Sequence, residues 1–259
     1  MTETIKRKGY ACIKKIPADI LEDLSRGKIE TASLTEALAI DFSLLLQETF
    51  PQLFAQKSHE IQNIHSLSFM MRTKFAAALL YEHYGLKIID ELILHPSDSV
   101  RGWAAGVISL NPNLSLEERL EQIKPLARDP HFGVREMAWL LLRDHIAEDI
   151  ATTITLLTPW VQDVNPYIRR FAVESTRPRG VWCSHIADLK NNPSLGLPLL
   201  EPLSQDPEKY VQDSVANWLN DAGKTNREFV LTLTQEWLKN SSHKATTYIC
   251  KRACRNLLK

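Results

Sequence analysis

Three carboxylates in the second half of the chain, Glu136, Glu174 and Asp221, have the type and spacing of side chains that can act together. Arg170 precedes Glu174 by four residues, about one turn of a helix. Grouped carboxylates can stabilise a developing oxocarbenium ion and orient a water for attack, as hydrolysis of a glycosidic bond requires. The alternative is that they are solvated charges on an exposed face, with Arg170 and Glu174 as a surface ion pair.

The histidines and cysteines lack the spacing of a metal site. His59 and His65 are six residues apart, so on a helix their imidazoles lie on different faces. Cys250 and Cys254 are one turn apart, but no second Cys or His pair at a suitable spacing joins them. No GxGxxG, Walker or GxSxG string occurs. We therefore expect no metal and no cofactor, and four sparse cysteines fit a reducing cytosol.

An internal repeat organises the residues around these carboxylates. Each copy has a proline in a turn, then an apolar anchor residue that is usually followed by arginine. The anchors are separated by 34, 34 and 43 residues, a period typical of stacked helical pairs. The anchors and the segments that contain them are Val100 in HPSDSVRGWAAGVI, Val134 in DPHFGVREMAWLLL, Ile168 in NPYIRRFAVES and Val211 in DPEKYVQDSVANWL.

The pattern predicts an all-α fold, a right-handed α-solenoid of HEAT-like helical pairs. In the second copy, apolar residues fall at positions 0, 3, 4, 7 and 8 from the anchor, which is one helical stripe. Only nine glycines occur, which favours helices over sheets with many tight turns. We expect one domain over residues 1–259, with a helical N-terminal region at 1–94 and recognisable repeats at 95–259. No run of 18 apolar residues and no secretory signal is present.

Besides the anchor helices, the sequence predicts helices at residues 16–24, 33–46, 67–84, 116–124, 150–161, 228–239 and 243–258. The helix at 116–124 should stop there because Pro125 disfavours helical geometry in the residue before it. The third interval exceeds the period by nine residues, and the extra length falls near residues 175–182, STRPRGVW. Loops that interrupt a repeat usually project on the binding face.

Positions 2, 6 and 10 after each anchor point away from the apolar stripe. Stacked repeats bring equivalent positions side by side, so these residues should line one concave surface. Trp218 falls on the stripe and should be core, whereas Trp139 lies at its border. The predicted surface holds Glu136, Arg170, Glu174, Asn217 and Asp221, with Trp182 near its edge.

Two strings carry a resemblance to a known family. RRFAVESTRPRGVW at 169–182 and YVQDSVANWLND at 210–221 resemble the AlkC branch of the HEAT-like alkylpurine DNA glycosylases, most clearly over residues 130–259. The resemblance implies excision of cationic alkylated bases such as 3-methyladenine and 3-methylcytosine. Some relatives carry a C-terminal immunoglobulin-like domain, which we do not expect in this chain.

The resemblance also implies roles for individual residues. Glu174 and Asp221 would be active-site carboxylates, with Glu136 as a third after a gap in the match. Arg170 would lie beside Glu174, and Trp182 would contact the lesion. Because the predicted surface offers arginine but no lysine for a Schiff base, monofunctional hydrolysis is favoured over lyase chemistry. Flipping of the base is left open.

The expected partner is double-stranded DNA with alkylated bases, bound by a monomer in the bacterial cytoplasm and associated with the nucleoid when it acts on DNA. Net charge is zero, but residues 237–259 hold six basic and no acidic residues, and residues 1–17 hold five basic and one acidic. Basic ends suit phosphate binding. The predicted backbone contacts are Arg169, Arg177, Arg179, Lys244, Lys251, Arg252 and Arg255.

Two alternative functions remain open. A catalytically silent HEAT-like protein could bind branched or damaged DNA, since fold does not fix function. It would bind with steep salt dependence and release no base. A protein–protein scaffold would present an apolar concave surface, and the charges at Glu136, Arg170, Glu174 and Asp221 count against it.

Overall fold

The computed structural model describes residues 7–257, and over that range it is helical without a strand, as predicted. The chain forms two compact units. Unit 1 comprises Met1–Leu114 and Asp129–Leu141, and unit 2 comprises Ser115–Arg128 and Leu142–Lys259. The boundary falls inside helix α9 (Phe132–Glu148). The single domain predicted over residues 1–259 stays a prediction.

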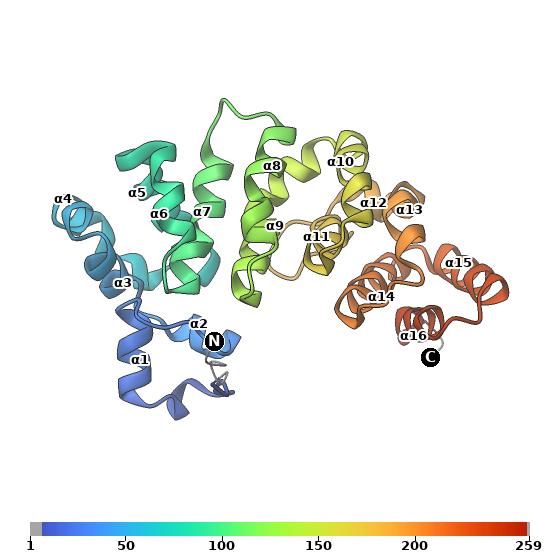
Figure 1. Cartoon of the computed structure of the whole chain (residues 1–259), viewed down its shortest axis with the longest axis horizontal. Helices are drawn as coiled ribbons and strands as arrows, with labels where there is room; N and C mark the ends of the chain where they lie inside the picture. Colours follow the sequence, from blue (N-terminus) through green and yellow to red (C-terminus); the bar gives the residue numbers. More distant parts are fainter. Residues whose placement is uncertain (1–6, 258–259) are drawn as a thin grey trace. The chain divides into compact units, whose positions relative to one another are not determined.

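The helices of unit 1, coloured from blue to green in Figure 1, pack around a group of aromatic side chains. The Trp103 ring is fully buried and lies 5.7 Å from the ring centroid of Phe42 and 6.5 Å from that of Phe50. Helices α5 and α6 both pack on α7, which carries Trp103. The helices of this unit are α1 (Ala18–Ser25), α2 (Leu34–Ala39), α3 (Phe42–Thr49), α4 (Pro51–Ile61), α5 (Phe69–Tyr84), α6 (Ile89–Ile93) and α7 (Asp98–Leu110).

Unit 2 holds two rows of helices. Helices α11, α14 and α16 pack side by side in one row, and α10, α13 and α15 belong to the other (Figure 1). Trp218 on α14 is fully buried, which confirms its predicted core position, and its indole N–H donates to the Thr176 carbonyl at 3.0 Å. The helices are α8 (Leu116–Ala127), α10 (Ile150–Leu157), α11 (Pro166–Ser175), α12 (Ala187–Asn191), α13 (Leu197–Leu200), α14 (Lys209–Gly223), α15 (Arg227–Asn240) and α16 (Lys244–Ala253).

Two helix predictions are wrong in detail. The range 33–46 holds two helices, because the chain turns at Ile40 and the Asp41 carboxylate accepts from the Leu44 N–H at the start of α3. Helix α8 runs through Pro125 to Ala127. The proline sits in the last turn, where it removes one backbone bond, and Leu126 and Ala127 are both buried beyond it. Burial of these side chains outweighs the lost bond.

The predicted anchors Val100, Val134, Ile168 and Val211 are all buried, and the residue after each anchor has a common structural task. Its side chain donates to two backbone carbonyls in the turn that precedes its own helix, five and six residues earlier. This contact supplies donors to carbonyls at the helix entry. The pairs are Arg101 with His95 and Pro96, Arg135 with Asp129 and Pro130, Arg169 with Asp163 and Val164, and Gln212 with Asp206 and Pro207.

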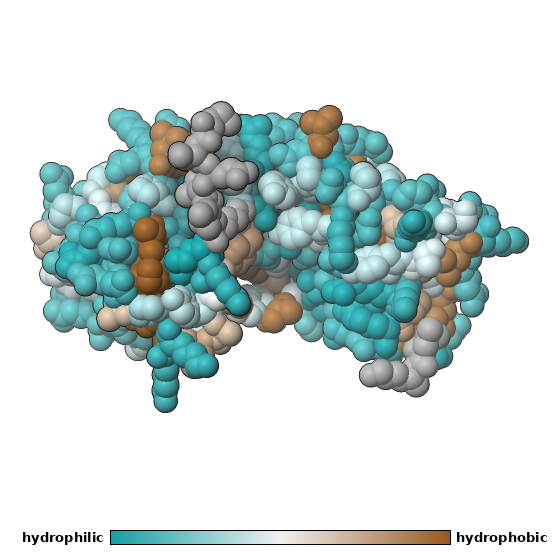
Figure 2. All heavy atoms as spheres, turned by 60° about the horizontal axis from the view of Figure 1, so that its bottom comes forward, coloured by the Kyte–Doolittle hydropathy of each residue, from teal (hydrophilic) through white to brown (hydrophobic). Residues whose placement is uncertain are grey.

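The surface is mostly polar on the face drawn in Figure 2, with hydrophobic side chains in small separate groups. A protein–protein scaffold would need a broad apolar surface, and this face does not offer one. Among residues 7–257, no helix is both long enough and apolar enough to cross a membrane.

Candidate functional site

Two carboxylates on neighbouring helices of unit 2 share one guanidinium. Glu174 lies in the last turn of α11, and Asp221 lies near the end of α14. Arg177, two residues beyond α11, places its side chain between them. These three residues, with Arg170, Ser214 and Lys224, are called the carboxylate cluster below.

Arg177 holds both acids directly. Its Nε and Nη2 donate to Oδ2 of Asp221 at 2.9 and 2.6 Å. Its Nη1 donates to Oε2 of Glu174 at 3.2 Å. Charge-assisted bonds of this kind are short and directional, so the guanidinium fixes the two carboxylates relative to one another.

The remaining oxygens are also occupied. Oε1 of Glu174 accepts from the Ser214 hydroxyl at 2.7 Å and lies 3.5 Å from Nη2 of Arg170. Oδ1 of Asp221 accepts from Nζ of Lys224 at 2.7 Å. The Arg170 guanidinium stacks over the Tyr210 ring, 4.2 Å from its centroid. The cluster therefore combines two negative side chains with three positive ones.

Burial separates this cluster from an ordinary charged surface. Glu174 is 3% exposed and Asp221 is 4% exposed, and Arg170 is buried as well. The interpretation of these residues as solvated charges is therefore wrong for all three, although the predicted Arg170–Glu174 ion pair is present. Burial alone lowers the pKa of Arg177, but Glu174 and Asp221 outweigh it and hold that pKa above its ordinary value.

The loop after α11 lies in the extra length of the third interval. Residues 177–186, called the 177–186 loop, are closed by a backbone bond from the Ile186 N–H to the Pro178 carbonyl at 3.1 Å. The loop presents Val181, which is 81% exposed, and Trp182, which is 37% exposed. Glycine is required at 180, because a Cβ there would lie 2.0 Å from Sγ of Cys183. The loop thus places the exposed Trp182 shortly after Arg177, which bridges the two carboxylates.

Two other residues predicted on the concave surface, Glu136 and Asn217, make hydrogen bonds outside the carboxylate cluster. Glu136 belongs to unit 1, where its Oε2 accepts from the indole N–H of Trp139 at 3.1 Å. Asn217 lies one turn before Asp221 on α14, and its Oδ1 accepts from Nη2 of Arg255 at 3.1 Å. The carboxylate cluster consists of unit 2 residues only, so the catalytic role of Glu136 stays a prediction.

Two of the arginines predicted to contact phosphates form ion pairs with protein carboxylates. Arg177 bridges Glu174 and Asp221, as described. The Arg169 guanidinium donates to both oxygens of Asp206, at 2.6 and 3.0 Å, and Asp206 is buried. The position after an anchor residue makes Arg169 part of the repeated turn contact, and its contact with a phosphate stays a prediction. Lys224 corrects one expectation, because it brings a lysine to the acidic pair.

Replacing Arg169 by Met is expected to lower the free energy of unfolding by about 3 kcal/mol, because it leaves the buried Asp206 carboxylate without its cation. Urea denaturation measures this change. Affinity for duplex DNA at fixed salt should stay within twofold of the parent. Arg179→Met is the matched control, expected to weaken DNA binding with little loss of stability. Unchanged stability with weakened binding in Arg169→Met would show that Arg169 contacts a phosphate.

The basic residues of the last helix differ in their pairing. Lys244 and Lys251 are exposed, whereas Nε of Arg252 lies 3.2 Å from Oδ1 of Asp213. Arg255, two residues beyond the end of α16, donates to Asn217. Their contact with DNA phosphates stays a prediction, with Arg179 of the 177–186 loop.

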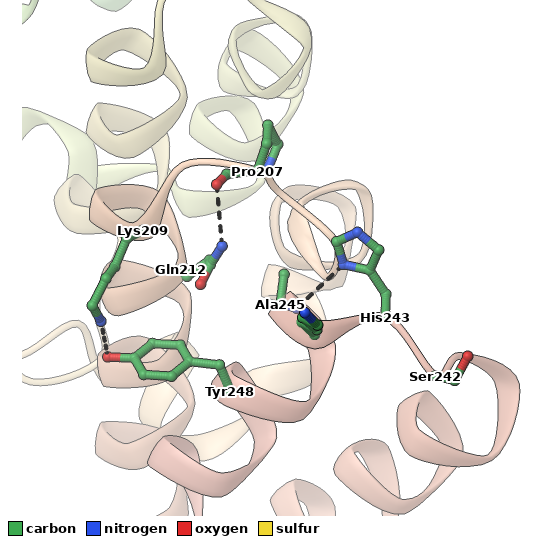
Figure 3. A pocket seen from close by; sticks show the side chains of 8 residues that line it. Pro207, Lys209, Gln212, Ser242, His243, Ala245 and Tyr248 are labelled. Atoms are coloured by element: carbon green, nitrogen blue, oxygen red, sulfur yellow. Dashed lines mark hydrogen bonds between the residues drawn. The ribbon is translucent and has the colours of Figure 1, made fainter.

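A separate hollow of about 800 Å³ lies between the starts of α14 and α16 (Figure 3). In it, Lys209 points to the Tyr248 hydroxyl, and Nδ1 of His243 accepts from the Ala245 N–H at the start of α16. Lys244 lines the same hollow. None of its lining residues belongs to the carboxylate cluster. No group of three or more His, Cys, Asp or Glu with metal-binding geometry occurs in the described part of the chain.

Sequence reasoning missed several members of the site. Ser214 lies inside the second matched string, and Lys224 follows Asp221 by three residues, so helical spacing was a usable signal for both. Arg143 contacts the 177–186 loop from the C-terminal part of α9. In the sequence, Arg143 is distinguished only as a charged residue directly after the apolar run 140–142.

The second half of the chain is similar to a family of repair enzymes. Residues 133–257 match the family model of DNA alkylation repair enzymes. The uncharacterized protein YhaZ of Bacillus subtilis (strain 168) is 38% identical over 139 residues, which is 54% of this chain and 38% of YhaZ.

Two solved structures share the fold. Pseudomonas fluorescens alkylpurine DNA glycosylase AlkC, bound to DNA containing an abasic site analog, aligns with a TM-score of 0.67 and 26% identity over 84% of this chain and 61% of AlkC. AlkD2 from Streptococcus mutans aligns with a TM-score of 0.61 and 20% identity over 80% of this chain and 98% of AlkD2. This chain thus spans less than two thirds of YhaZ and of the AlkC chain.

Proposed function

We propose that the chain is a DNA glycosylase of the AlkC/AlkD superfamily that excises cationic alkylated bases, because its second half matches the family model of DNA alkylation repair enzymes and its fold is similar to that of AlkC. The substrates proposed are 3-methyladenine and 3-methylcytosine in double-stranded DNA. The observation that carries the proposal is the nearly buried pair of Glu174 and Asp221 bridged by Arg177. Such a pair can stabilise positive charge on a sugar and accept a proton from water.

The chemistry needs little beyond these carboxylates. Methylation at N3 makes the base cationic, so it leaves with the electron pair of the C1′–N bond and becomes neutral without an added proton. Positive charge then develops on the sugar, where a carboxylate stabilises it. The water oxygen forms the new bond to C1′, and one water proton passes to a carboxylate. Glu174 and Asp221 take these two roles in the proposal.

Access to the carboxylates requires the Arg177 side chain to move, because it covers both acids. A phosphodiester is a partner of the same charge as a carboxylate and accepts the same bidentate bonds. In the proposal, a DNA phosphate next to the lesion pairs with Arg177 or Lys224. The carboxylate that loses this partner then contacts the sugar. Trp182, half-exposed on the 177–186 loop, is proposed to contact the exposed base.

The deciding experiment measures base release from duplex DNA that contains 3-methyladenine or 3-methylcytosine, separated by chromatography. Release of either base by folded protein supports the proposal, and release of neither, with folding checked by circular dichroism, overturns it. Steeply salt-dependent binding to branched DNA in the absence of release would favour a silent DNA-binding protein.

Lys224 makes the choice between hydrolysis and lyase chemistry testable, since a lyase needs an amine that forms a Schiff base. Its Nζ pairs with Asp221. Borohydride added during the reaction traps any Schiff base as a covalent protein–DNA product. A monofunctional hydrolase yields no trapped product and leaves an uncut abasic strand, and a trapped product that Lys224→Met abolishes would show that Lys224 acts as a lyase nucleophile.

A further inference from the structure

Arg143 is a buried cation held by backbone carbonyls. Its side chain lies in the part of α9 that belongs to unit 2, and it is 1% exposed. Its Nη1 donates to the Ser175 carbonyl at 2.7 Å and its Nη2 to the Arg177 carbonyl at 2.5 Å. The Ser184 carbonyl accepts from Nη2 at 3.2 Å and from Nε at 3.3 Å. These three carbonyls belong to the end of α11 and to both arms of the 177–186 loop.

Burial of the charged Arg143 guanidinium costs free energy. Its contacts with the three carbonyls therefore indicate a loop conformation that the chain holds firmly. Burial lowers the pKa of Arg143, yet an arginine remains charged in proteins. Three carbonyls that converge on one point repel one another unless a donor lies between them. A guanidinium offers five donors in a fixed plane, so one side chain satisfies all three.

The Arg177 carbonyl links this contact to the carboxylate cluster. Arg143 holds the main chain of Arg177, while the side chain of Arg177 holds Glu174 and Asp221. On the other arm, Arg143 holds Ser184, two residues after Trp182. The buried Arg143 side chain therefore fixes the main chain of Arg177 and the loop that carries Trp182.

We propose that Arg143 is a positioning residue for base excision, which fixes the 177–186 loop and the Arg177 main chain beside the two carboxylates and leaves the Arg177 side chain free to exchange partners. The kinetic part rests on the proposed glycosylase activity, whereas the conformational part does not. Arg143 touches no reacting atom in this assignment, and it acts through the Arg177 main chain.

The conformational part is tested with a thiol probe. Cys183 in the loop is half-buried, Cys250 and Cys254 are buried, and Cys12 is exposed. In a Cys12→Ser background, Arg143→Met should raise the rate of Cys183 modification by the disulfide reagent DTNB at least tenfold. Loss of the Arg143 charge would by itself raise the pKa of this thiol and slow the reaction, because that charge lowers it. Faster modification therefore reports an opened loop.

The kinetic part is tested by single-turnover base release at saturating enzyme. Arg143→Met should slow release about 30-fold, with Kd for abasic-site DNA within threefold of the parent. Arg143→Lys should recover to within about fivefold, because an ammonium still donates to some of the carbonyls. A purely structural role lowers the folded fraction without changing the rate per folded molecule.

Gly180→Ala is a second variant that disturbs the loop without touching Arg143, because its Cβ would meet Sγ of Cys183 at 2.0 Å. The same kinetic defect is expected. Arg101→Met is the matched control, since Arg101 also holds two carbonyls, in the turn before α7. It should lower stability and leave the release rate per folded molecule unchanged.

An unchanged Cys183 rate in Arg143→Met overturns the proposal whatever the activity. A faster Cys183 rate with unchanged release from an active parent also overturns it. If the parent releases no base, the proposed function fails, and the Cys183 rate alone decides whether Arg143 fixes the loop. Faster modification together with slower release and recovery by Lys supports it.

Discussion

Glu174→Gln is expected to slow release of a methylated base by at least about 100-fold while Kd for abasic-site DNA stays within threefold. The amide keeps the shape of the carboxylate but removes the charge that stabilises the developing cation, and one preorganised electrostatic contact contributes about 10²–10³ in rate. Single-turnover release from duplex DNA measures the effect.

Glu174→Gln should lower the free energy of unfolding by only about 1–2 kcal/mol, although its NH₂ faces Nη2 of Arg170, which lies 3.5 Å from Oε1 in the parent. The Gln carbonyl can keep the bond from Arg177, and its NH₂ then faces Ser214. The Ser214 hydroxyl can accept from that NH₂ and donate to the Tyr210 carbonyl, 3.3 Å away. The variant therefore separates loss of charge from loss of structure.

Asp221→Asn should lose the same activity and also stability. Both oxygens of Asp221 accept from cations, so one of them must be replaced by an NH₂ that faces Arg177 or Lys224. Urea denaturation should give a loss of about 2 kcal/mol. Glu228→Gln, an exposed acid at the start of α15, is the control with parental activity. Parental release rates in both Glu174→Gln and Asp221→Asn would remove these residues from the catalytic assignment.

Arg177→Met should lower the free energy of unfolding by about 3–5 kcal/mol at pH 7, because it leaves two buried carboxylates without the cation between them. Urea denaturation of parent and variant at pH 7 measures this change.

The double variant Arg177→Met/Glu174→Gln should recover part of the loss, since only one carboxylate then needs a counter-charge. No recovery in the double variant would mean that Arg177 contributes through packing rather than charge.

Much of the fold followed from local patterns. The buried anchors, the stripe from Val134 and the core position of Trp218 were predictable because helical periodicity reports which side chains face inward. The helix errors at Asp41 and Pro125 have opposite causes. The single helix predicted at 33–46 missed a boundary that capping by Asp41 creates, whereas the end predicted before Pro125 gave too little weight to the burial of Leu126.

The site was only partly predictable. Repeat register placed Glu174 and Asp221 on equivalent faces of successive anchor helices, and the structure brings them to one guanidinium. The same register did not predict the carboxylate partners of Arg169 and Arg177. Arginines with similar surroundings in sequence differ in their tasks according to which buried carboxylate lies within reach.

The helical class, the repeat and the acidic residues of the candidate site were predictable from spacing, because each depends on one helix or one period. The burial of these acids, the bridge from Arg177 to Asp221 and the contact of Arg143 with the loop became visible in the folded chain alone. The last two contacts join residues more than 30 positions apart, and no local pattern encodes them.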